Sequence, residues 1–325
     1  MQVYISRNIP KEAIDLLENQ GMQLSINTEN KLLSQAELIA ACQGKDLLLN
    51  VGHADLNASF MQQCPQLKAI ALASVGYDHV DLSAATAHGI AVSNTPGVLS
   101  AATADVAFLL MLAVSRKAFF RAQQVHAGQW KDFEFMQDLG VELQGKTLGI
   151  YGLGRIGLDF ATKAKAAYHM NIIYYNRSRN MEAERLLDAK YVNFDELLTQ
   201  SDVLSVHSNL SDETRYRFDK SVFQRMKNSA IFINTARGKI HCENDLYDAL
   251  LNGEIWGAGL DVTDPEPMSP TNPLLTLPSV CVLPHIGSAT METRKQMAIL
   301  SATNLLAAAT GNPMPQIINP EVYKV

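Results

Sequence analysis

The chain has 325 residues, more than one hydrophobic core usually serves, so we expect two domains. Hydrophobic residues make up 47% of it and charged residues 18%, which is the balance of a globular protein with ample apolar surface to bury. The net charge is −6, and the sequence contains no block of like charge that would bind nucleic acid or an anionic membrane. The composition therefore favours a small-molecule partner, with no nucleic acid and no membrane.

The cysteines and the apolar segments indicate the compartment. The four cysteines are scattered without C-x-x-C spacing, so they predict neither a disulfide framework nor a zinc site and suit a reducing cytosol. The N-terminus reads as a first strand rather than a secretion signal. The most apolar stretch, residues 106–114, is too short to cross a bilayer and reads as a buried helix. We therefore expect a cytoplasmic protein.

The first ninety residues alternate short strands with helices, which predicts a parallel sheet covered by helices. We expect strands over residues 3–5, 24–26, 47–50 and 67–72, with helices over 10–21 and near 36–42. Asn94-Thr95-Pro96-Gly97 is a turn signal. After it, the apolar pattern predicts one long helix from about Ser100 to about Ala127, which leads into the second domain.

Strand–helix alternation restarts at Thr147 and continues to about Pro284, which predicts a second parallel sheet. Its strands are expected over residues 147–151, 172–175, 203–207, 230–234, 257–261 and 281–283. A last helix, over about 291–310, has no strand after it. We therefore expect this helix to pack back on the first domain.

The most informative motif is TLGIYGLGRIG over residues 147–157, because its G-x-G-x-x-G follows an apolar strand and precedes a helix. That context indicates a dinucleotide site. Gly152 allows the tight turn, Gly154 lets the backbone approach a pyrophosphate, and Gly157 permits close packing of helix on strand. The predicted cofactor contacts in this loop are Leu153, Gly154, Arg155 and Ile156. The alternative is an ordinary glycine-rich turn of an α/β domain.

Three later stretches place charged or titratable side chains directly after predicted strands. They are N-T-A-R-G over 234–238, G-L-D-V-T-D-P-E-P over 259–267 and P-H-I-G-S over 284–288. Open α/β sheets bind ligands at the carboxyl ends of their strands, so these side chains can face a cofactor crevice. Taken singly, each is more often a solvated loop residue, a rigid exposed turn or a local helix cap.

Together, in this order and spacing, the glycine motif and the three later stretches resemble the D-isomer-specific 2-hydroxyacid dehydrogenases over essentially the whole chain. The resemblance implies an α/β fold with two doubly wound parallel-sheet domains. A Rossmann dinucleotide-binding domain, residues 99–288, would be inserted in a flavodoxin-like substrate domain made of residues 1–98 and 289–325. The resemblance also implies a homodimer and a catalytic set of Arg237, Glu266 and His285.

The same resemblance assigns further contacts to the substrate and to the cofactor. Backbone N–H groups of Val75 and Gly76 would receive the substrate carboxylate, Val51 would lie on a second substrate-facing loop, and Arg237 would bind the substrate. The further cofactor contacts that it implies are Thr103, Thr235, Ala236, Arg237, Asp261, His285 and Gly287.

The chemistry of reducing a 2-oxo acid assigns a role to each catalytic side chain. Hydride arrives at the carbonyl carbon, and the oxygen becomes an alkoxide that an imidazole such as His285 can protonate near neutral pH. Glu266, bonded to that imidazole, would favour its charged form and fix its orientation. Arg237 offers a fork of donors to the substrate carboxylate and can polarise the carbonyl.

The cofactor preference is predicted from the end of the strand at 172–175. NAD sites place an acidic residue there to bind the adenosine ribose, whereas this chain has Asn176 followed by Arg177, Ser178 and Arg179. Without a carboxylate nothing repels a 2′-phosphate, and two arginines and a hydroxyl can bind it. We therefore predict that NADPH is preferred over NADH. The alternative is a basic loop with no phosphate role.

Within the family, Y-Y-N-R-S-R and the two later motifs look most like the glyoxylate/hydroxypyruvate reductases and the related 2-ketogluconate reductases. We therefore expect reduction of glyoxylate or hydroxypyruvate to the D-2-hydroxy acid, with a 2-oxo sugar acid as the alternative substrate. A formate- or phosphite-type dehydrogenase and a dinucleotide-sensing corepressor are the competing classes. The intact Arg, Glu and His set argues against the corepressor.

Overall fold

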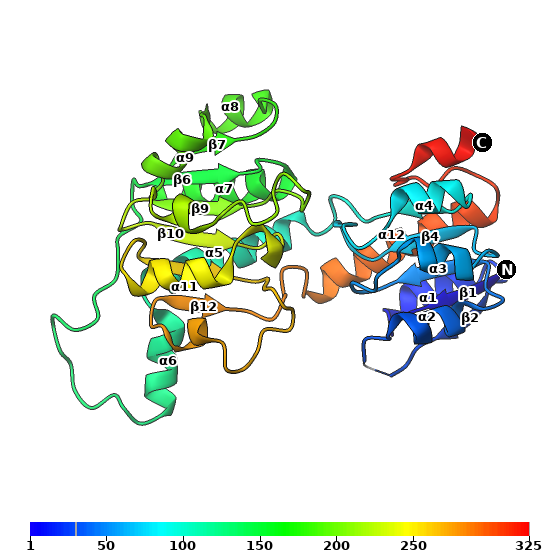
Figure 1. The fold of residues 1–325 in the computed structure, drawn as a ribbon, viewed down its shortest axis with the longest axis horizontal. Coiled ribbons are helices and arrows are strands. Elements are labelled where there is room, and N and C mark those ends of the chain that lie inside the picture. Colours follow the sequence, from blue (N-terminus) through cyan, green and yellow to red (C-terminus); the bar gives the residue numbers. More distant parts are fainter. Residues whose placement is uncertain (30, 325) are drawn as a thin grey trace. The chain divides into compact units, whose positions relative to one another are not determined.

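The computed structural model describes residues 1–29 and 31–324 and consists of two compact units. One unit comprises Met1–Leu99 with Ala289–Val325, and the other comprises Ser100–Ser288. In sequence, the second unit is therefore an insertion in the first. Both units are built on parallel sheets (Figure 1), as the strand–helix alternation predicted.

The first unit contains a five-stranded parallel sheet in the order β2-β1-β3-β4-β5. The strands are β1 (Gln2–Ile5), β2 (Gln23–Ile26), β3 (Leu47–Asn50), β4 (Ala69–Leu72) and β5 (Ala91–Ser93). This is the flavodoxin-like doubly wound order. β3 and β4 are buried along their whole length because both faces of the sheet are covered.

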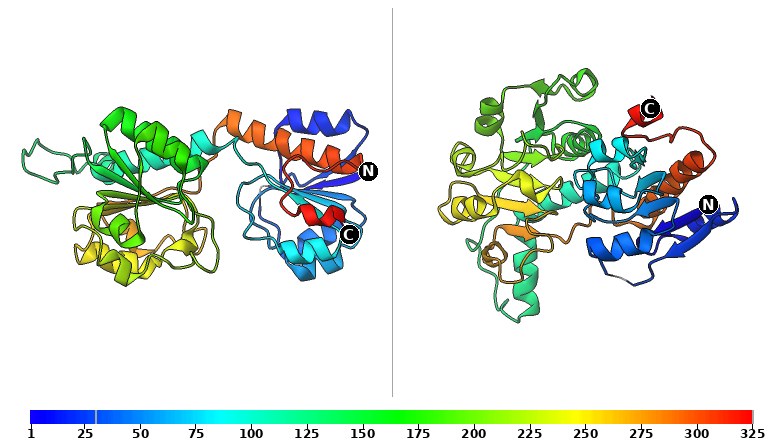
Figure 2. Two further views of the ribbon diagram at one scale, coloured as in Figure 1. Left: turned by 90° about the horizontal axis from the view of Figure 1, so that it is seen from above. Right: turned by 45° about the vertical axis from the view of Figure 1, so that its right-hand side comes forward.

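Helices cover both faces of this sheet (Figure 2). They are α1 (Lys11–Glu18), α2 (Gln35–Cys42), α3 (Ala58–Gln63), α4 (Leu82–Ala87) and α12 (Met291–Ala309). α1 and α12 pack on the face that carries Val3 and Ile5, and α2, α3 and α4 pack on the face that carries Tyr4. The last long helix thus packs on the first unit, as the lack of a strand after it predicted.

The second unit contains a seven-stranded parallel sheet in the order β12-β11-β10-β9-β6-β7-β8. The strands are β6 (Thr147–Tyr151), β7 (Asn171–Tyr175), β8 (Lys190–Tyr191), β9 (Val203–Val206), β10 (Ile231–Asn234), β11 (Gly257–Leu260) and β12 (Val280–Val282). Counted from β6, this is the 3-2-1-4-5-6 order of dinucleotide-binding folds with β12 added at one edge. The order of strands reverses between β6 and β9.

Two helical layers enclose the second sheet, and Figure 2 shows them on opposite faces. The helices are α5 (Ser100–Ser115), α6 (Ala118–His126), α7 (Arg155–Tyr168), α8 (Met181–Leu187), α9 (Phe194–Gln200), α10 (Lys220–Phe223) and α11 (Glu243–Leu251). α5, α7 and α8 share one apolar core, and α9, α10 and α11 share the other. Within the described residues, no helix combines the length and the apolarity that a membrane span needs.

The single long helix predicted over residues 100–127 is wrong, because the chain breaks between α5 and α6. The carbonyl of Ser115 accepts the N–H of Val141 at 2.9 Å, and a Cβ on Gly140 would lie 2.3 Å from that carbonyl oxygen. A returning segment therefore occupies the end of α5. Lys117 adopts a left-handed backbone, with φ of 51°, and its ammonium lies 4.9 Å from the centre of the Trp256 ring. These contacts are non-local, so local helix propensity gives no sign of the break.

Candidate active site

In the second unit, the predicted site residues that follow strands lie on five loops, after β6, β7, β10, β11 and β12. Because the strands are all parallel, these loops emerge at one edge of the sheet. Residues far apart in sequence are brought to this edge by strand pairing, such as that of β10 with β11 and of β11 with β12.

The three glycines of the first loop lie in three different structural environments. Gly152 has a φ of +94°, and a Cβ there would lie 2.6 Å from the backbone nitrogen of Ser208. A Cβ on Gly157 would lie 3.0 Å from Cγ2 of Ile150, so helix and strand pack closely. Around Gly154 a Cβ would meet nothing within 4 Å. The loop therefore has tight backbone packing on one side and open space at Gly154.

That open space lies at the start of α7, whose N-cap residue, Gly154, has no side chain that could cap the first N–H groups. The first N–H groups of a helix lack acceptors inside the helix, and the helix dipole concentrates positive potential there. Arg155 and Ile156 contribute two of these groups. An uncapped helix start with room for a ligand fits the pyrophosphate of a dinucleotide.

The loop after β7 is bonded to the glycine loop through one asparagine. Oδ1 of Asn176 accepts the N–H of Leu153 at 2.6 Å, and Nδ2 of Asn176 donates to the Leu153 carbonyl at 3.2 Å. Leu153 is also buried, so its backbone is a structural link. Arg177 and Ser178 are exposed. Arg179, expected to join them at a phosphate, is instead bonded to Glu184, with 2.9 Å between Nε and Oε1.

Asp261, at the end of β11, holds the loop that carries His285. Asp261 is 1% exposed, and its two carboxylate oxygens accept the N–H groups of Ile286 and Gly287, each at 2.8 Å. Burial raises the pKa of Asp261, and these two hydrogen bonds oppose that rise. Thr103 donates from Oγ1 to the Gly287 carbonyl at 3.1 Å. Both residues, implied above as cofactor contacts, thus also brace this loop.

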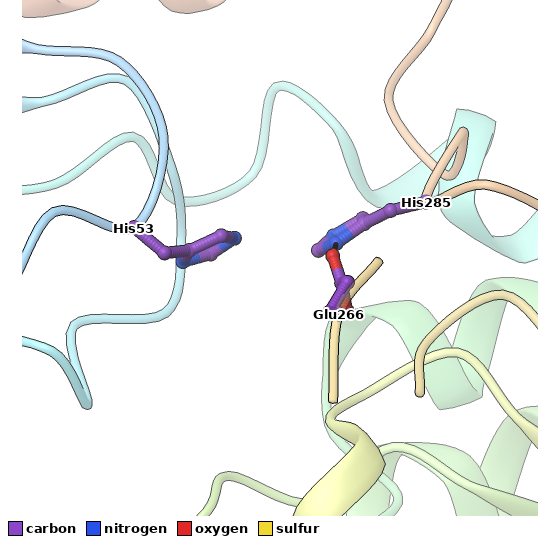
Figure 3. Close-up of side chains that lie close together, drawn as sticks. All are labelled: His53, Glu266 and His285. Carbon is purple, nitrogen blue, oxygen red and sulfur yellow. Dashed lines mark hydrogen bonds and ion pairs between the residues drawn. The ribbon is translucent and has the colours of Figure 1, made fainter. Parts of the chain in front are cut away.

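His285 and Glu266 come together as the sequence predicted (Figure 3). Nδ1 of His285 and Oε1 of Glu266 are 2.5 Å apart, and the two side chains are 31% and 37% exposed. The His285 backbone is left-handed, with φ of 54°, a conformation that costs energy for a residue other than glycine. With Nδ1 bonded to a carboxylate, Nε2 is the nitrogen that can give up a proton.

Arg237 lies in a tight turn after β10. Asn234 accepts the N–H of Ala236 at 2.9 Å and donates to the Arg237 carbonyl at 2.8 Å. Gly238 is required here, because a Cβ would lie 2.0 Å from the carbonyl oxygen of Thr263. Thr235 is buried and Arg237 is half-buried. The turn therefore fixes the backbone from which the guanidinium extends.

The predicted substrate residues of the first unit lie on loops after β3 and β4. Val51 donates its N–H to Oγ of Ser6 at 2.8 Å, so this amide already has an acceptor. The carbonyls of Val75 and Gly76 accept from Asn94 and Ser74, each at 2.8 Å. Within the described part of the chain, the N–H groups of Val75 and Gly76 have no acceptor. Two fixed N–H donors fit the expected binding of a carboxylate.

Sequence reasoning assigned no role to two histidines of the second unit. His207, after β9, is bonded to Oγ of Ser205 at 2.9 Å, and burial lowers its pKa to about 3. Nδ1 of His241 lies 3.1 Å from Nδ2 of Asn234, the side chain that fixes the Arg237 turn, and burial lowers the pKa of His241 to about 4. Neither histidine belongs to one of the motifs above. His241 is fully buried and His207 is half-buried, which depends on packing that one sequence does not reveal.

Asp261→Asn is expected to lower both stability and turnover. An amide offers one acceptor oxygen and places an NH2 against the second N–H, which leaves one buried donor unpaired at a cost of about 1–3 kcal/mol. For a unit of this size that corresponds to a Tm lower by roughly 2–10 °C, and the displaced His285 loop should slow reduction. Differential scanning calorimetry and steady-state kinetics measure the two effects. The exposed Asp248→Asn is the matched control, and equal Tm values for the two variants would contradict this role of Asp261.

His241→Asn is expected to flatten the acid dependence of stability. The native histidine stays neutral down to about pH 4, whereas the unfolded one takes up a proton below about pH 6.5, so acid favours unfolding. Between pH 6.5 and 5 this one group should remove about 2 kcal/mol. Asparagine keeps an acceptor for Asn234 but does not titrate. Tm values at pH 7.5 and 5.0 test this, and equal losses in both proteins would refute it.

Comparisons with known proteins agree with this geometry. The sequence profile described as "D-isomer specific 2-hydroxyacid dehydrogenase, NAD binding domain" matches residues 108–287. A glyoxylate reductase of Thermococcus litoralis is 42% identical over 325 residues, covering 99% of this chain and 97% of its own. A glyoxylate/hydroxypyruvate reductase B of Salmonella heidelberg is 39% identical, covering 98% of each chain.

A solved structure with a similar fold carries a dinucleotide. It is an NADPH-dependent glyoxylate/hydroxypyruvate reductase from Sinorhizobium meliloti, in complex with NADP and malonate. The TM-score is 0.85 at 30% sequence identity, and the alignment covers 98% of this chain and 97% of that one.

Proposed function

The chain belongs to the D-isomer-specific 2-hydroxyacid dehydrogenases, and we propose that it reduces glyoxylate or hydroxypyruvate to the D-2-hydroxy acid with NADPH. The observation that carries this proposal is the His285–Glu266 pair, on loops at the same sheet edge as an uncapped helix start. The pair provides a proton donor, and the helix start suits a dinucleotide phosphate.

The three catalytic side chains divide the work on the substrate. NADPH, when bound, supplies the hydride for the carbonyl carbon. Arg237 binds the substrate carboxylate through its fork of donors and stabilises the negative charge that develops on the carbonyl oxygen. His285 gives the proton on Nε2 to that oxygen, and Glu266 holds the ring by Nδ1. In the first unit, Val75 and Gly76 offer two N–H donors that suit a carboxylate.

Initial rates test the reaction and its substrate class. Oxidation of NADPH and NADH is followed with glyoxylate, hydroxypyruvate, pyruvate and 2-ketogluconate. We expect turnover with glyoxylate or hydroxypyruvate, and a higher kcat/KM for either than for pyruvate. Faster turnover of 2-ketogluconate would make a sugar acid the substrate. The proposal would be overturned if NADPH and NADH each bind but neither supports reduction of any of these 2-oxo acids. That result would favour formate-type oxidation or dinucleotide sensing.

The preference for NADPH over NADH rests on the loop after β7. The residue at the end of β7 is Asn176 rather than an acid, and the exposed Arg177 and Ser178 follow it. A guanidinium and a hydroxyl beside an uncharged amide suit a 2′-phosphate. The similar reductase from Sinorhizobium meliloti is described as NADPH-dependent, which supports the same preference here.

We also propose a homodimer that forms through the segment between α6 and β6. Large apolar side chains of this segment and of the end of α6 are 53–81% exposed: Val125, Trp130, Phe133, Phe135, Met136 and Leu139. Monomeric proteins rarely expose so many large apolar side chains together, and a self-complementary interface would cover them. A cytoplasmic location remains our expectation, because all four cysteines are free thiols.

Replacing Trp130 and Phe133 together by serine is expected to shift the dimer to monomer. The loss of two large aromatic side chains from an interface typically weakens it by several kcal/mol, because such residues dominate interface energetics. Sedimentation velocity at micromolar concentration measures the species present. Replacing the exposed Leu251 of α11 by serine is the control. A wild-type protein that sediments as a monomer would contradict the proposed dimer.

A further inference from the structure

The turn over residues 176–180 is anchored at both ends. Asn176 is bonded to the backbone of Leu153 through both atoms of its amide, and the Asn176 carbonyl accepts from the hydroxyl of Tyr191 at 3.0 Å. At the other end, Nδ2 of Asn180 donates to the Leu153 carbonyl at 3.0 Å. The two asparagines therefore fix the turn to the glycine loop.

Arg179 takes part in this anchoring. Its Nε donates to Oε1 of Glu184 at 2.9 Å, and its Nη2 pairs with Oε2 of the same carboxylate. Oε1 of Glu184 also accepts the hydroxyl of Tyr174 at 2.6 Å, and that hydroxyl accepts the N–H of Asn180 at 2.8 Å. The pKa of Glu184 lies below its usual range, mainly because of its hydrogen bonds with Arg179. The Glu184 side chain is 16% exposed, so this pair is partly shielded from water.

Between the anchored ends, only Arg177 and Ser178 remain as exposed side chains of the turn without an ion pair or hydrogen bond inside the described chain. Their neighbours on both sides are committed to internal partners. The turn thus presents one guanidinium and one hydroxyl, although its sequence contains two arginines.

We propose that Arg177 and Ser178 alone hold the 2′-phosphate of NADPH and that Glu184 is a specificity-determining residue, because it holds Arg179 out of the phosphate site. This inference rests on the proposed preference for NADPH. Glu184 weakens phosphate binding in two ways: it engages the second guanidinium, and it adds a negative charge close to the turn. Its own contact with the cofactor is not required.

The test uses binding of adenosine 2′,5′-bisphosphate and of adenosine 5′-monophosphate, measured by titration calorimetry at one ionic strength. The dissociation constant of adenosine 5′-monophosphate divided by that of adenosine 2′,5′-bisphosphate reports how much the 2′-phosphate contributes to binding, without turnover. Arg177→Gln should lower this ratio by about tenfold to a hundredfold, the range for losing a charge-assisted bond. Glu184→Gln keeps an acceptor for Tyr174 and should raise the ratio by up to about fivefold.

The decisive variant replaces both partners, Arg179→Gln with Glu184→Gln, which leaves the net charge of the turn unchanged. We expect its ratio to stay within about twofold of wild type, since the pair it removes is not a ligand. Arg185 is exposed and follows Glu184 directly in the sequence. The Arg185→Gln variant therefore controls for the loss of one positive charge near the turn. Thermal unfolding confirms that every variant is folded.

Three results would overturn parts of this account, and they can be told apart. A wild-type ratio near one would refute the preference for NADPH itself. A normal wild-type ratio that falls in the double variant as far as in Arg177→Gln would show that Arg179 binds the phosphate. A ratio that Glu184→Gln leaves unchanged or lowers would show that Glu184 does not restrain Arg179.

Discussion

His285→Asn is expected to reduce kcat for glyoxylate reduction by about 10²–10⁴-fold, the usual contribution of a positioned general acid. Asparagine tolerates the left-handed backbone that His285 adopts, with φ of 54°, so the loop should keep its conformation. Its amide can still donate to Glu266, but it carries no proton for the alkoxide. The loss should therefore fall on turnover.

Stopped-flow and steady-state kinetics with NADPH measure this effect, and fluorescence titration measures cofactor binding separately. Cofactor affinity should stay within about threefold of wild type if the variant removes only the proton donor. A kcat reduced less than threefold would mean that solvent or another group supplies the proton, and His285 would lose its assigned role.

Arg237→Lys is expected to reduce kcat/KM by about 10²–10³-fold, with changes in both kcat and KM. Lysine keeps the positive charge but loses the planar fork that bonds a carboxylate twice, and each charge-assisted hydrogen bond contributes about 1.5–3 kcal/mol. The turn itself should persist, because Asn234 and Gly238 fix its backbone.

The neighbouring Lys239 provides a matched control for Arg237. It is exposed, and its carbonyl rather than its side chain bonds the N–H of Tyr216 at 2.8 Å. Lys239→Gln should change kcat/KM by less than about twofold. If Arg237→Lys behaves like this control, then charge alone is sufficient and the proposed two-point binding is wrong.

The sheets were predictable because their strands are short, continuous apolar runs that are buried on both faces. β3 occupies the predicted residues 47–50, and β7, β9, β10, β11 and β12 differ from expectation by one residue at one or both ends. β5, β8 and α10 were missed because three, two and four residues carry no periodic signal. The break after Ser115 was missed because Gly140, Val141 and Trp256 cause it from a distance.

The candidate site was predictable where the spacing of residues in a local motif determines the backbone geometry. The G-x-G-x-x-G spacing fixed the glycine loop, and the motif around Glu266 and the one around His285 lie on loops that the structure joins through a 2.5 Å contact. The bracing contacts of Asp261 needed the folded chain, since its partners are 25 and 26 residues away. The pairing of Arg179 with Glu184 spans only five residues, but the sequence could not predict it. Nothing in the sequence distinguishes Arg179, which pairs with Glu184, from Arg177, which does not.

The measurement that tests the central claim most directly is the chirality of the product formed from hydroxypyruvate. NADPH and hydroxypyruvate are incubated with the enzyme, and the glycerate is separated by chiral chromatography. Membership of the D-isomer-specific family predicts D-glycerate in large excess. L-glycerate, a racemate, or NADPH oxidation without glycerate would contradict the assignment of this site to D-2-hydroxy acid chemistry.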